Sequence, residues 1–583
     1  MSEPESRICS HLRFLYGDSA VVDLWPRLQE RLSAFRKSHP EFSQGVPAPS
    51  ERLTQRDVIL ITYGDQISEP GSSPLQTLAA FLETHVREVI TGVHLLPFFP
   101  YSSDDGFSVI DYMAVNPTLG NWEDIRRLGE SFRLMFDGVI NHISAQSAWF
   151  QAFLAGAPEF ADAFLAVDPD TDLSQVVRPR ALPLLTPVRT VSGEERWVWT
   201  TFSVDQIDLN FADPGVLLRI VGVMWFYVAQ GGEGVRLDAI AYLWETICTP
   251  CIHLEETHRV VKLFRAVIDW VAPGVMLITE TNVPHEENVS YFGDGSDEAQ
   301  LIYQFPLPPL VLHALATGDA SHLTAWASGL SLPSRTTTFY NFLASHDGIG
   351  VRPVEGILAP EDVRLLADRT LAHGGQVSYK ANADGSQSIY ELNISYFDAL
   401  SNPQDDEPLA VQASRFMVSQ AIMLALQGVP GIYVHSLLGS RNDREGLRRT
   451  GRPRSINREK LRRAELEAVL ADPASLRHAV FTAYCRLIRA RTAYAAFHPN
   501  GAQQVLPLHP ALFSVLRVAP DGTEPLLCVH NVSDASLSVP VDFAVLQGGQ
   551  GGAVWDVITG ERASITDGSL HCAPYQVLWL KGL

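Results

Sequence analysis

The chain has 583 residues, a formal net charge of -22 and a hydrophobic share of 46%. This length and composition predict a globular protein with more than one domain. The negative charge argues against nucleic acid and anionic membrane surfaces as partners, and an anionic substrate would require a local basic patch.

The sequence predicts a cytoplasmic protein. It has no apolar run of about 18 residues, so no membrane span is expected. The opening stretch MSEPESRICSHLRF carries acidic residues and no apolar segment, unlike a secretory signal. Six cysteines in a chain of this length do not indicate a disulfide framework, and we expect reduced thiols.

The predicted elements begin with a helical lead-in over residues 1–55. Over residues 56–500, eight β-rich runs follow, most of them separated by helical patterns: DVILITYGD, VHLLPFFP, FRLMFDGVINH, GVRLDAI, GVMLITETN, AQLIYQF, TTFYNFLASHDG and GVPGIYVHSLLG. Such alternation is typical of the α/β class with a parallel sheet, and eight units predict a (β/α)8 TIM barrel.

The barrel pattern is interrupted twice, by residues 143–213 and 348–403. Long insertions after barrel strands usually form loop subdomains over the active-site face, and we expect that here. From residue 501 to residue 583 the pattern changes to short strands with turn signals. This stretch predicts a C-terminal all-β domain, a small β-sandwich.

Polar residues stand where nearly every predicted strand ends, which is where a TIM barrel carries its chemistry. They are Asp104, Asp137, Asn141, His142, Arg236, Asp238, Glu280, His346 and Asp347. The three carboxylates Asp238, Glu280 and Asp347 would converge from different strands. Glycoside chemistry requires a nucleophile or base and an acid, and two such carboxylates can supply them.

Arg236 and Asp238 are two residues apart, so their side chains share one side of the strand. Taken alone, this pair is either a structural ion pair or part of a working site. In a working site, Arg236 would keep the Asp238 carboxylate ionised as a nucleophile. Partial burial would raise the pKa of Glu280, as a general acid requires.

Four segments, DGVINH, GVRLDAIAYLW, ITETN and FLASHDGIG, resemble in this order the conserved segments of the α-amylase superfamily, glycoside hydrolase family 13. The resemblance implies that Asp238 is the nucleophile, Glu280 the acid/base and Asp347 the transition-state stabiliser. It also implies the residues that hold the glucosyl unit: Arg236, His142 and His346, with Asp104 at its far hydroxyls and Phe107 as an aromatic face.

VHLLPFFP, HDGIG, SLLGSRND and SINR are similar to motifs of the sucrose phosphorylase subfamily, and the resemblance covers nearly the whole chain. Within it, YSSDDGFSVIDY, VVRPRALPLLTPVRT and CIHLEETH resemble the glucosylglycerate phosphorylases. This implies transfer of a glucosyl unit between phosphate and glycerate, with no metal and no organic cofactor. Small-molecule substrates are the implied partners, and a homodimer is compatible with the resemblance.

The same resemblance implies roles for residues around the acceptor site. Arg180 would bind phosphate together with Tyr390, Arg454 would contact the glucosyl unit, and Gln206 would lie beside the acceptor. The loop DGSQSIYELN departs from sucrose phosphorylases, which usually have Leu-Asp at Gln387 and Ser388 and Gln at Glu391. The departure argues against sucrose as the substrate.

Three alternatives to glucosylglycerate phosphorolysis remain at this point. A sucrose or glucosylglycerol phosphorylase would share the catalytic residues and differ in the acceptor loops. An α-glucoside hydrolase would release glucose instead of glucose 1-phosphate. A catalytically silent barrel could serve as a binding protein, although the intact carboxylates argue against it.

Local cations are needed to bind phosphate and glycerate. Arginine binds both groups through paired donors. Arg178, Arg448 and Arg452 are candidates for the glycerate carboxylate, and the alternative for most of the arginines after the eighth strand is a solvated helical face.

One short motif has the spacing of a metal site. In CTPCIHLEETH, Cys248 and Cys251 are followed by His253 and His258, as in some zinc sites. No second C-x-x-C follows, and Pro250 lies inside the pair. We therefore favour chance spacing at the start of a helix.

Overall fold

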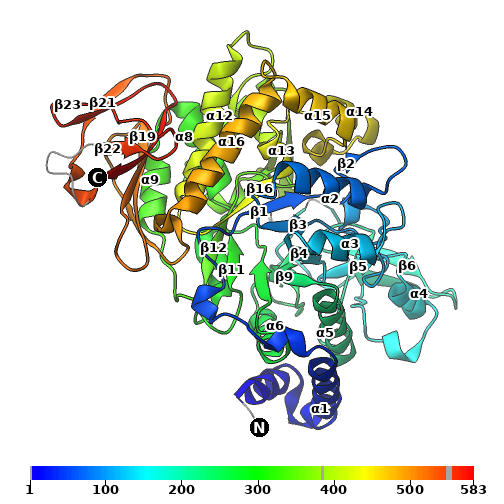
Figure 1. The fold of residues 1–583 in the computed structure, drawn as a ribbon. Coiled ribbons are helices and arrows are strands. Elements are labelled where there is room, and N and C mark those ends of the chain that lie inside the picture. Colours follow the sequence, from blue (N-terminus) through cyan, green and yellow to red (C-terminus); the bar gives the residue numbers. More distant parts are fainter. Residues whose placement is uncertain (1–2, 181, 383–385, 547–553, 583) are drawn as a thin grey trace.

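The computed structural model describes residues 3–180, 182–382, 386–546 and 554–582 (Figure 1). Eight strands form a closed barrel in the order β1-β16-β12-β11-β10-β9-β4-β3, and all neighbouring pairs are parallel. They are β1 (Ile59–Thr62), β3 (Gly92–Leu95), β4 (Arg133–Gly138), β9 (Gly232–Leu237), β10 (Met276–Thr279), β11 (Leu301–Tyr303), β12 (Thr338–Asn341) and β16 (Val429–Tyr433). Each lies in one of the eight predicted runs, so the predicted TIM barrel is confirmed.

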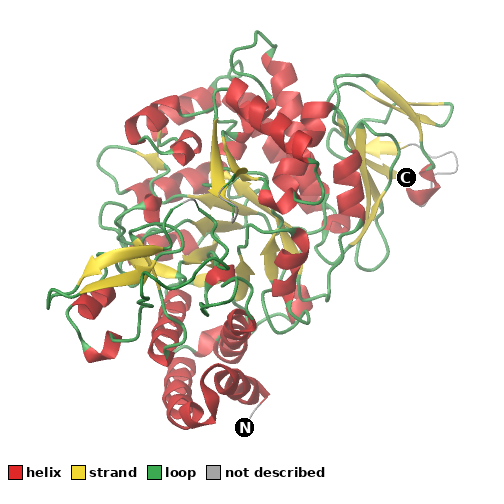
Figure 2. Ribbon diagram, turned by 180° about the vertical axis from the view of Figure 1, so that it is seen from behind, coloured by secondary structure: helices red, strands yellow, loops and turns green. Residues whose placement is uncertain are grey.

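The barrel strands are apolar because helices cover them from outside, as Figure 2 shows. Every residue of β1 and of β10 is buried. The surrounding helices include α2 (Pro74–His85), α3 (Trp122–Gly129), α5 (Pro214–Ala229), α6 (Glu255–Val271), α8 (Leu307–Thr317), α12 (Leu409–Ala425) and α16 (Leu476–Ala493). Several begin at a side chain that accepts from the first-turn amides: Ser73, Asn121, Asp213 and Ser475.

The N-terminal lead-in is helical. Helix α1 (Glu3–Ser38) contains a break at Gly17, whose φ of 79° is readily adopted only by glycine. The helix packs against α6 outside the barrel, at the lower end of Figure 1. Trp25 of α1 stacks on Trp270 of α6, with ring centroids 5.8 Å apart.

Both predicted insertions contain small sheets. After β4, β5 (His142–Ser144) pairs with β8 (Gln206–Asp208), and β6 (Leu185–Arg189) forms a hairpin with β7 (Glu195–Trp199). After β12, β13 (Ile349–Gly350), β15 (Gln387–Asn393) and β14 (Gln376–Ala381) form a three-stranded sheet in that order.

The C-terminal region is all-β, at the upper left of Figure 1. A five-stranded sheet is formed by β18 (Ala502–Val505), β19 (Leu512–Val518), β20 (Leu526–Asn531), β25 (Val577–Gly582) and β22 (Val554–Asp556). A three-stranded sheet is formed by β21 (Leu537–Pro540), β24 (Ser569–Cys572) and β23 (Ile565–Thr566). Among all described residues, no helix is long and apolar enough to cross a membrane.

Candidate active site

Three carboxylates follow barrel strands at their carboxyl ends. Asp238 follows β9, Glu280 follows β10, and Asp347 lies beyond β12. Leu237 and Thr279 are register partners in neighbouring strands, so Asp238 and Glu280 emerge side by side. The backbone N–H of Ala239, a residue in the left-handed region with a φ of 49°, donates to Glu280 Oε2 at 3.0 Å. Backbone strain of this kind concentrates at functional sites.

Arg236 contacts both Asp238 and Glu280, as well as Asp137. Its side chain is 2% exposed, and its Nη1 donates both to Asp137 and, at 2.8 Å, to Asp238 Oδ1. Its Nη2 lies 3.6 Å from Glu280 Oε2. His94 contacts the other oxygen of Asp137 at 2.9 Å. One guanidinium therefore holds the Asp238 and Glu280 carboxyl groups near each other.

Burial is the main cause of the unusual protonation at this site. It raises the pKa of Asp238 to about 8, with Glu280 and Asp137 adding to the rise and Arg236 opposing it. Burial also raises the pKa of Glu280, against Arg236. The expectation that Arg236 keeps Asp238 ionised needs correction, because desolvation exceeds the effect of a cation shared among three carboxylates. Both carboxyl groups therefore hold a proton more strongly than free carboxyl groups do, and their titrations are linked.

Asp347 behaves in the opposite way. Burial would raise its pKa, but Arg454, His346 and Arg458 hold it far below its usual value. Arg454 comes from the short helix η8 (Pro453–Asn457) and forms an ion pair with Asp347. This carboxylate is therefore ionised throughout the physiological pH range and can stabilise a neighbouring positive charge.

Arg454 has a second carboxylate partner that the sequence reasoning did not foresee. Its Nε and Nη2 donate to the two oxygens of Glu391 at 3.1 and 2.8 Å. Glu391 lies in β15 and is 3% exposed. A Cβ on Gly348 would lie 2.6 Å from the Glu391 Cγ, so only glycine beside Asp347 admits this approach. The negative charge of Glu391, at a position where sucrose phosphorylases usually have Gln, is thus neutralised by Arg454.

Two histidines and Phe107 form a packed group beside the carboxylates. His142 Nε2 lies 2.8 Å from the Phe107 carbonyl oxygen and 3.0 Å from Gln206 Nε2. Phe107 stacks on His346, with centroids 4.6 Å apart and ring planes 6° from parallel. Burial lowers the pKa of His142 to about 4, so this imidazole is neutral at pH 7. The contact of Phe107 with a sugar stays a prediction.

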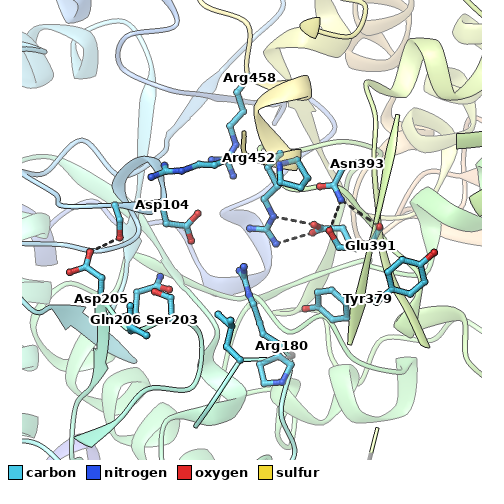
Figure 3. Close-up of a pocket in the computed structure, with 18 residues that line it drawn as sticks. Asp104, Arg180, Ser203, Asp205, Gln206, Tyr379, Glu391, Asn393, Arg452 and Arg458 are labelled. Atoms are coloured by element: carbon cyan, nitrogen blue, oxygen red, sulfur yellow. Dashed lines mark hydrogen bonds and ion pairs between the residues drawn. The ribbon is translucent and has the colours of Figure 1, made fainter. Parts of the chain in front are cut away.

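A cavity of about 510 Å³ is lined by most of the other predicted binding residues (Figure 3). Asp104, Arg180, Gln206, Tyr390 and Arg454 line it, together with Glu391, Arg452 and Arg458. In Figure 3, Arg180 extends into the cavity from the wall opposite Arg452 and Arg458. Because Arg454 also contacts Asp347, the cavity adjoins the carboxylates.

Two other arginine candidates, Arg178 and Arg448, are not among the residues that line this cavity. Arg178 donates to the carbonyl oxygen of Leu182. Arg448 lies on α14 (Arg444–Thr450), where its side chain is 76% exposed and pairs with Glu445. Arg448 thus belongs to a solvated helical face, as the alternative interpretation expected.

Within the motif CTPCIHLEETH, Cys251 and both histidines contact other protein groups. The Cys251 thiol donates to the carbonyl oxygen of Thr246 at 3.3 Å, and Cys248 is exposed. His253 contacts Glu287 at 3.1 Å, and His258 contacts Glu298 at 3.0 Å. Across the described part of the chain, no group of three or more His, Cys, Asp or Glu side chains could hold a metal ion.

A parallel barrel with paired carboxylates at its strand ends, beside a cavity of sugar size, defines a carbohydrate-active enzyme of the glycosidase type. The family profile "Alpha amylase, catalytic domain" matches residues 87–347. A glucosylglycerate phosphorylase from Allomeiothermus silvanus is 52% identical over 91% of this chain and 93% of its own length. A glucosylglycerate phosphorylase from Escherichia coli is 43% identical over 99% of this chain and 100% of its own.

Among solved structures, a sucrose 6F-phosphate phosphorylase from Thermoanaerobacter thermosaccharolyticum superposes with a TM-score of 0.71. It is 27% identical, over 82% of this chain and 94% of its own length. The chain therefore belongs to the α-amylase family, in the same branch as the glucosylglycerate phosphorylases.

Proposed function

We propose that this chain is a retaining glycoside phosphorylase that converts 2-O-α-D-glucosylglycerate and phosphate into α-D-glucose 1-phosphate and D-glycerate. The observation that carries the proposal is the arginine-lined cavity beside the carboxylates, in a chain with a net charge of -22. A cavity of this kind suits anions on both sides of the reaction. Identities of 52% and 43% to glucosylglycerate phosphorylases support this substrate.

The proposed reaction is a double displacement. In the first step Asp238 attacks the anomeric carbon while Glu280 gives its proton to the bridging oxygen, and glycerate leaves. In the second step a phosphate oxygen attacks the same carbon as Glu280 takes up the proton, and the bond to Asp238 breaks. Two inversions retain the α configuration. Asp347 stabilises the positive charge on the sugar ring in both steps.

The remaining predicted residues take binding roles in the same proposal. The glucosyl unit is held by His142, His346, Arg236, Asp104, Phe107 and Arg454. Phosphate is bound by Arg180 with Tyr390, and Gln206 lies beside the acceptor. No metal or organic cofactor takes part. The proposal also includes a cytoplasmic location and a homodimeric state.

Donor preference tests the proposal against the related phosphorylases. With phosphate at saturation, kcat/KM is measured for glucosylglycerate, glucosylglycerol and sucrose. We expect glucosylglycerate to exceed the other two by at least about tenfold, because a charged group recognised by paired donors contributes on the order of 1.5–3 kcal/mol. Higher efficiency with sucrose or glucosylglycerol would reassign the enzyme to that substrate.

The pH dependence follows from the raised pKa values of Asp238 and Glu280. Because burial raises the pKa of Asp238 to about 8 and also raises the pKa of Glu280, the linked pair loses protons as the pH rises through that region. The first step needs a proton on Glu280 for the leaving group, so kcat/KM for glucosylglycerate should fall above about pH 8. A profile that still rises at pH 9 would contradict this protonation scheme.

Replacing Arg180 with methionine should separate phosphorolysis from hydrolysis. Within the described residues Arg180 forms no ion pair, so its donors are available to phosphate. We expect the KM for phosphate to rise about 10- to 100-fold, as the loss of charge-assisted hydrogen bonds predicts. The slow release of glucose without phosphate should stay unchanged, and an unaltered KM for phosphate would remove Arg180 from the phosphate site.

A further inference from the structure

The four arginines of the cavity differ in how many of their donors are in use. Arg454 is bound by Glu391 and Asp347. Arg458 donates through Nε to the carbonyl oxygen of His346 at 2.7 Å and through Nη1 to Asp105, and its side chain is 5% exposed. Both of these cations are neutralised by carboxylates in contact with them.

Arg452 is held much more loosely. Among the described residues its guanidinium contacts one carboxylate, Asp105, at 3.8 Å, and Asp105 is already bound by Arg458. The side chain is 53% exposed. Its backbone, in contrast, is fixed, because its N–H donates to Thr450 Oγ1 at 3.2 Å and Pro453 follows it at the start of η8. A fixed backbone with a loosely held guanidinium is suited to binding a ligand.

Arg180 and Arg452 lie on opposite walls of the cavity (Figure 3). Arg180 is near enough to Tyr390 and His142 to influence both electrostatically, which places its charge on the inner side. Phosphate must reach the anomeric carbon, so it requires a cation on that side. The acid group of the acceptor can instead meet the free donors of the facing wall.

On the basis of the proposed function, we propose that Arg452 binds the carboxylate of the glycerate acceptor. A guanidinium presents two parallel donors that match the two oxygens of a carboxylate. The ligand carboxylate would replace the long contact of Arg452 with Asp105. Phosphate and glycerate would then be recognised by different arginines, and acceptor preference would depend on Arg452 rather than on Arg180.

The test uses the reverse reaction, in which α-glucose 1-phosphate is the donor. D-glycerate is compared with glycerol, which has a neutral hydroxymethyl group in place of the carboxylate. The readout is the ratio of kcat/KM for the two acceptors in the wild type, Arg452→Met, Arg452→Lys and Arg180→Met. Arg448→Met is the matched control, because it removes an exposed arginine outside the cavity.

We expect Arg452→Met to lower the glycerate-to-glycerol ratio about 10- to 100-fold, the loss associated with a charge-assisted hydrogen-bonded pair. Arg452→Lys should fall between this variant and the wild type, because lysine keeps the charge but not the paired donors. The glycerol rate reports correct folding and should fall much less than the glycerate rate. Arg180→Met and Arg448→Met should retain the wild-type ratio.

An unchanged ratio in Arg452→Met would overturn the assignment, and so would a fall in Arg180→Met alone, which would show one anion site for both ligands. The proposed function fails differently. A wild type that exchanges labelled phosphate with α-glucose 1-phosphate but does not prefer glycerate to glycerol would be a phosphorylase for another acceptor. In that case both the substrate and the role of Arg452 would be wrong.

Discussion

Replacing Asp238 with asparagine should lower the rate of phosphorolysis by on the order of 10⁴-fold or more. Losses of this size are seen when the nucleophile is removed from a group of catalytic residues that act together. Glu280→Gln should be similarly inactive with glucosylglycerate, because the glycerate oxygen then leaves without a proton. The two variants are distinguished by α-glucosyl fluoride, whose leaving group needs no acid. Glu280→Gln should react rapidly with it to form the glucosyl-enzyme, whereas Asp238→Asn should not. Equal behaviour of the two variants would contradict the assigned roles.

The pH dependence of unfolding shows whether Asp238→Asn is folded and whether the Asp238 carboxyl group is buried. Because burial raises the pKa of Asp238 to about 8, the native protein binds more protons than the unfolded chain between the ordinary value of 3.8 and 8. Wild-type stability should therefore fall as the pH rises across this window. The asparagine variant has no such proton to lose. Its denaturation midpoint relative to that of the wild type should be higher at pH 8 than at pH 5, and the opposite trend would disprove the burial argument.

Replacing Arg236 with methionine should damage both stability and activity. The guanidinium is 2% exposed and contacts Asp137, Asp238 and Glu280. Removing it leaves buried carboxylates without their cation, a change that typically costs about 3–5 kcal/mol. We expect a loss of this size in the free energy of unfolding at pH 7, measured by urea denaturation, together with loss of turnover.

The control for Arg236→Met is Arg448→Met. The ion pair of Arg448 with Glu445 is largely exposed, and such pairs contribute on the order of 0–1 kcal/mol. Asp137 keeps His94 as a second partner, whereas Asp238 and Glu280 lose the cation that they share. If Arg236→Met unfolded at the same urea concentration as the wild type, Arg236 would not be neutralising these carboxylates.

The barrel and its carboxylates could be predicted from sequence because both depend on local patterns. Each strand is a short apolar run, and the polar residue that ends it is next to it in the chain. Neighbouring parallel strands then bring Asp238 and Glu280 together without further information, as the register of Leu237 with Thr279 shows.

The contacts that tune the site could not be predicted in this way. His94 and Asp137 are 43 residues apart, and Glu391 and Arg454 are 63 residues apart on an inserted strand and a separate short helix. No local pattern pairs them. The protonation of Asp238 depends on how completely it is buried and on how one arginine is shared, and neither can be read from spacing alone.

The central claim is that a glucosyl unit passes from glycerate to phosphate with retained configuration. The most direct measurement is to follow the reaction of glucosylglycerate with phosphate, catalysed by the enzyme, by phosphorus and proton nuclear magnetic resonance. A parallel sample contains no phosphate. We predict that α-glucose 1-phosphate and glycerate form in equal amounts, with no early β anomer and little free glucose. Initial formation of β-glucose 1-phosphate, or phosphate-independent release of glucose as the main product, would contradict the account.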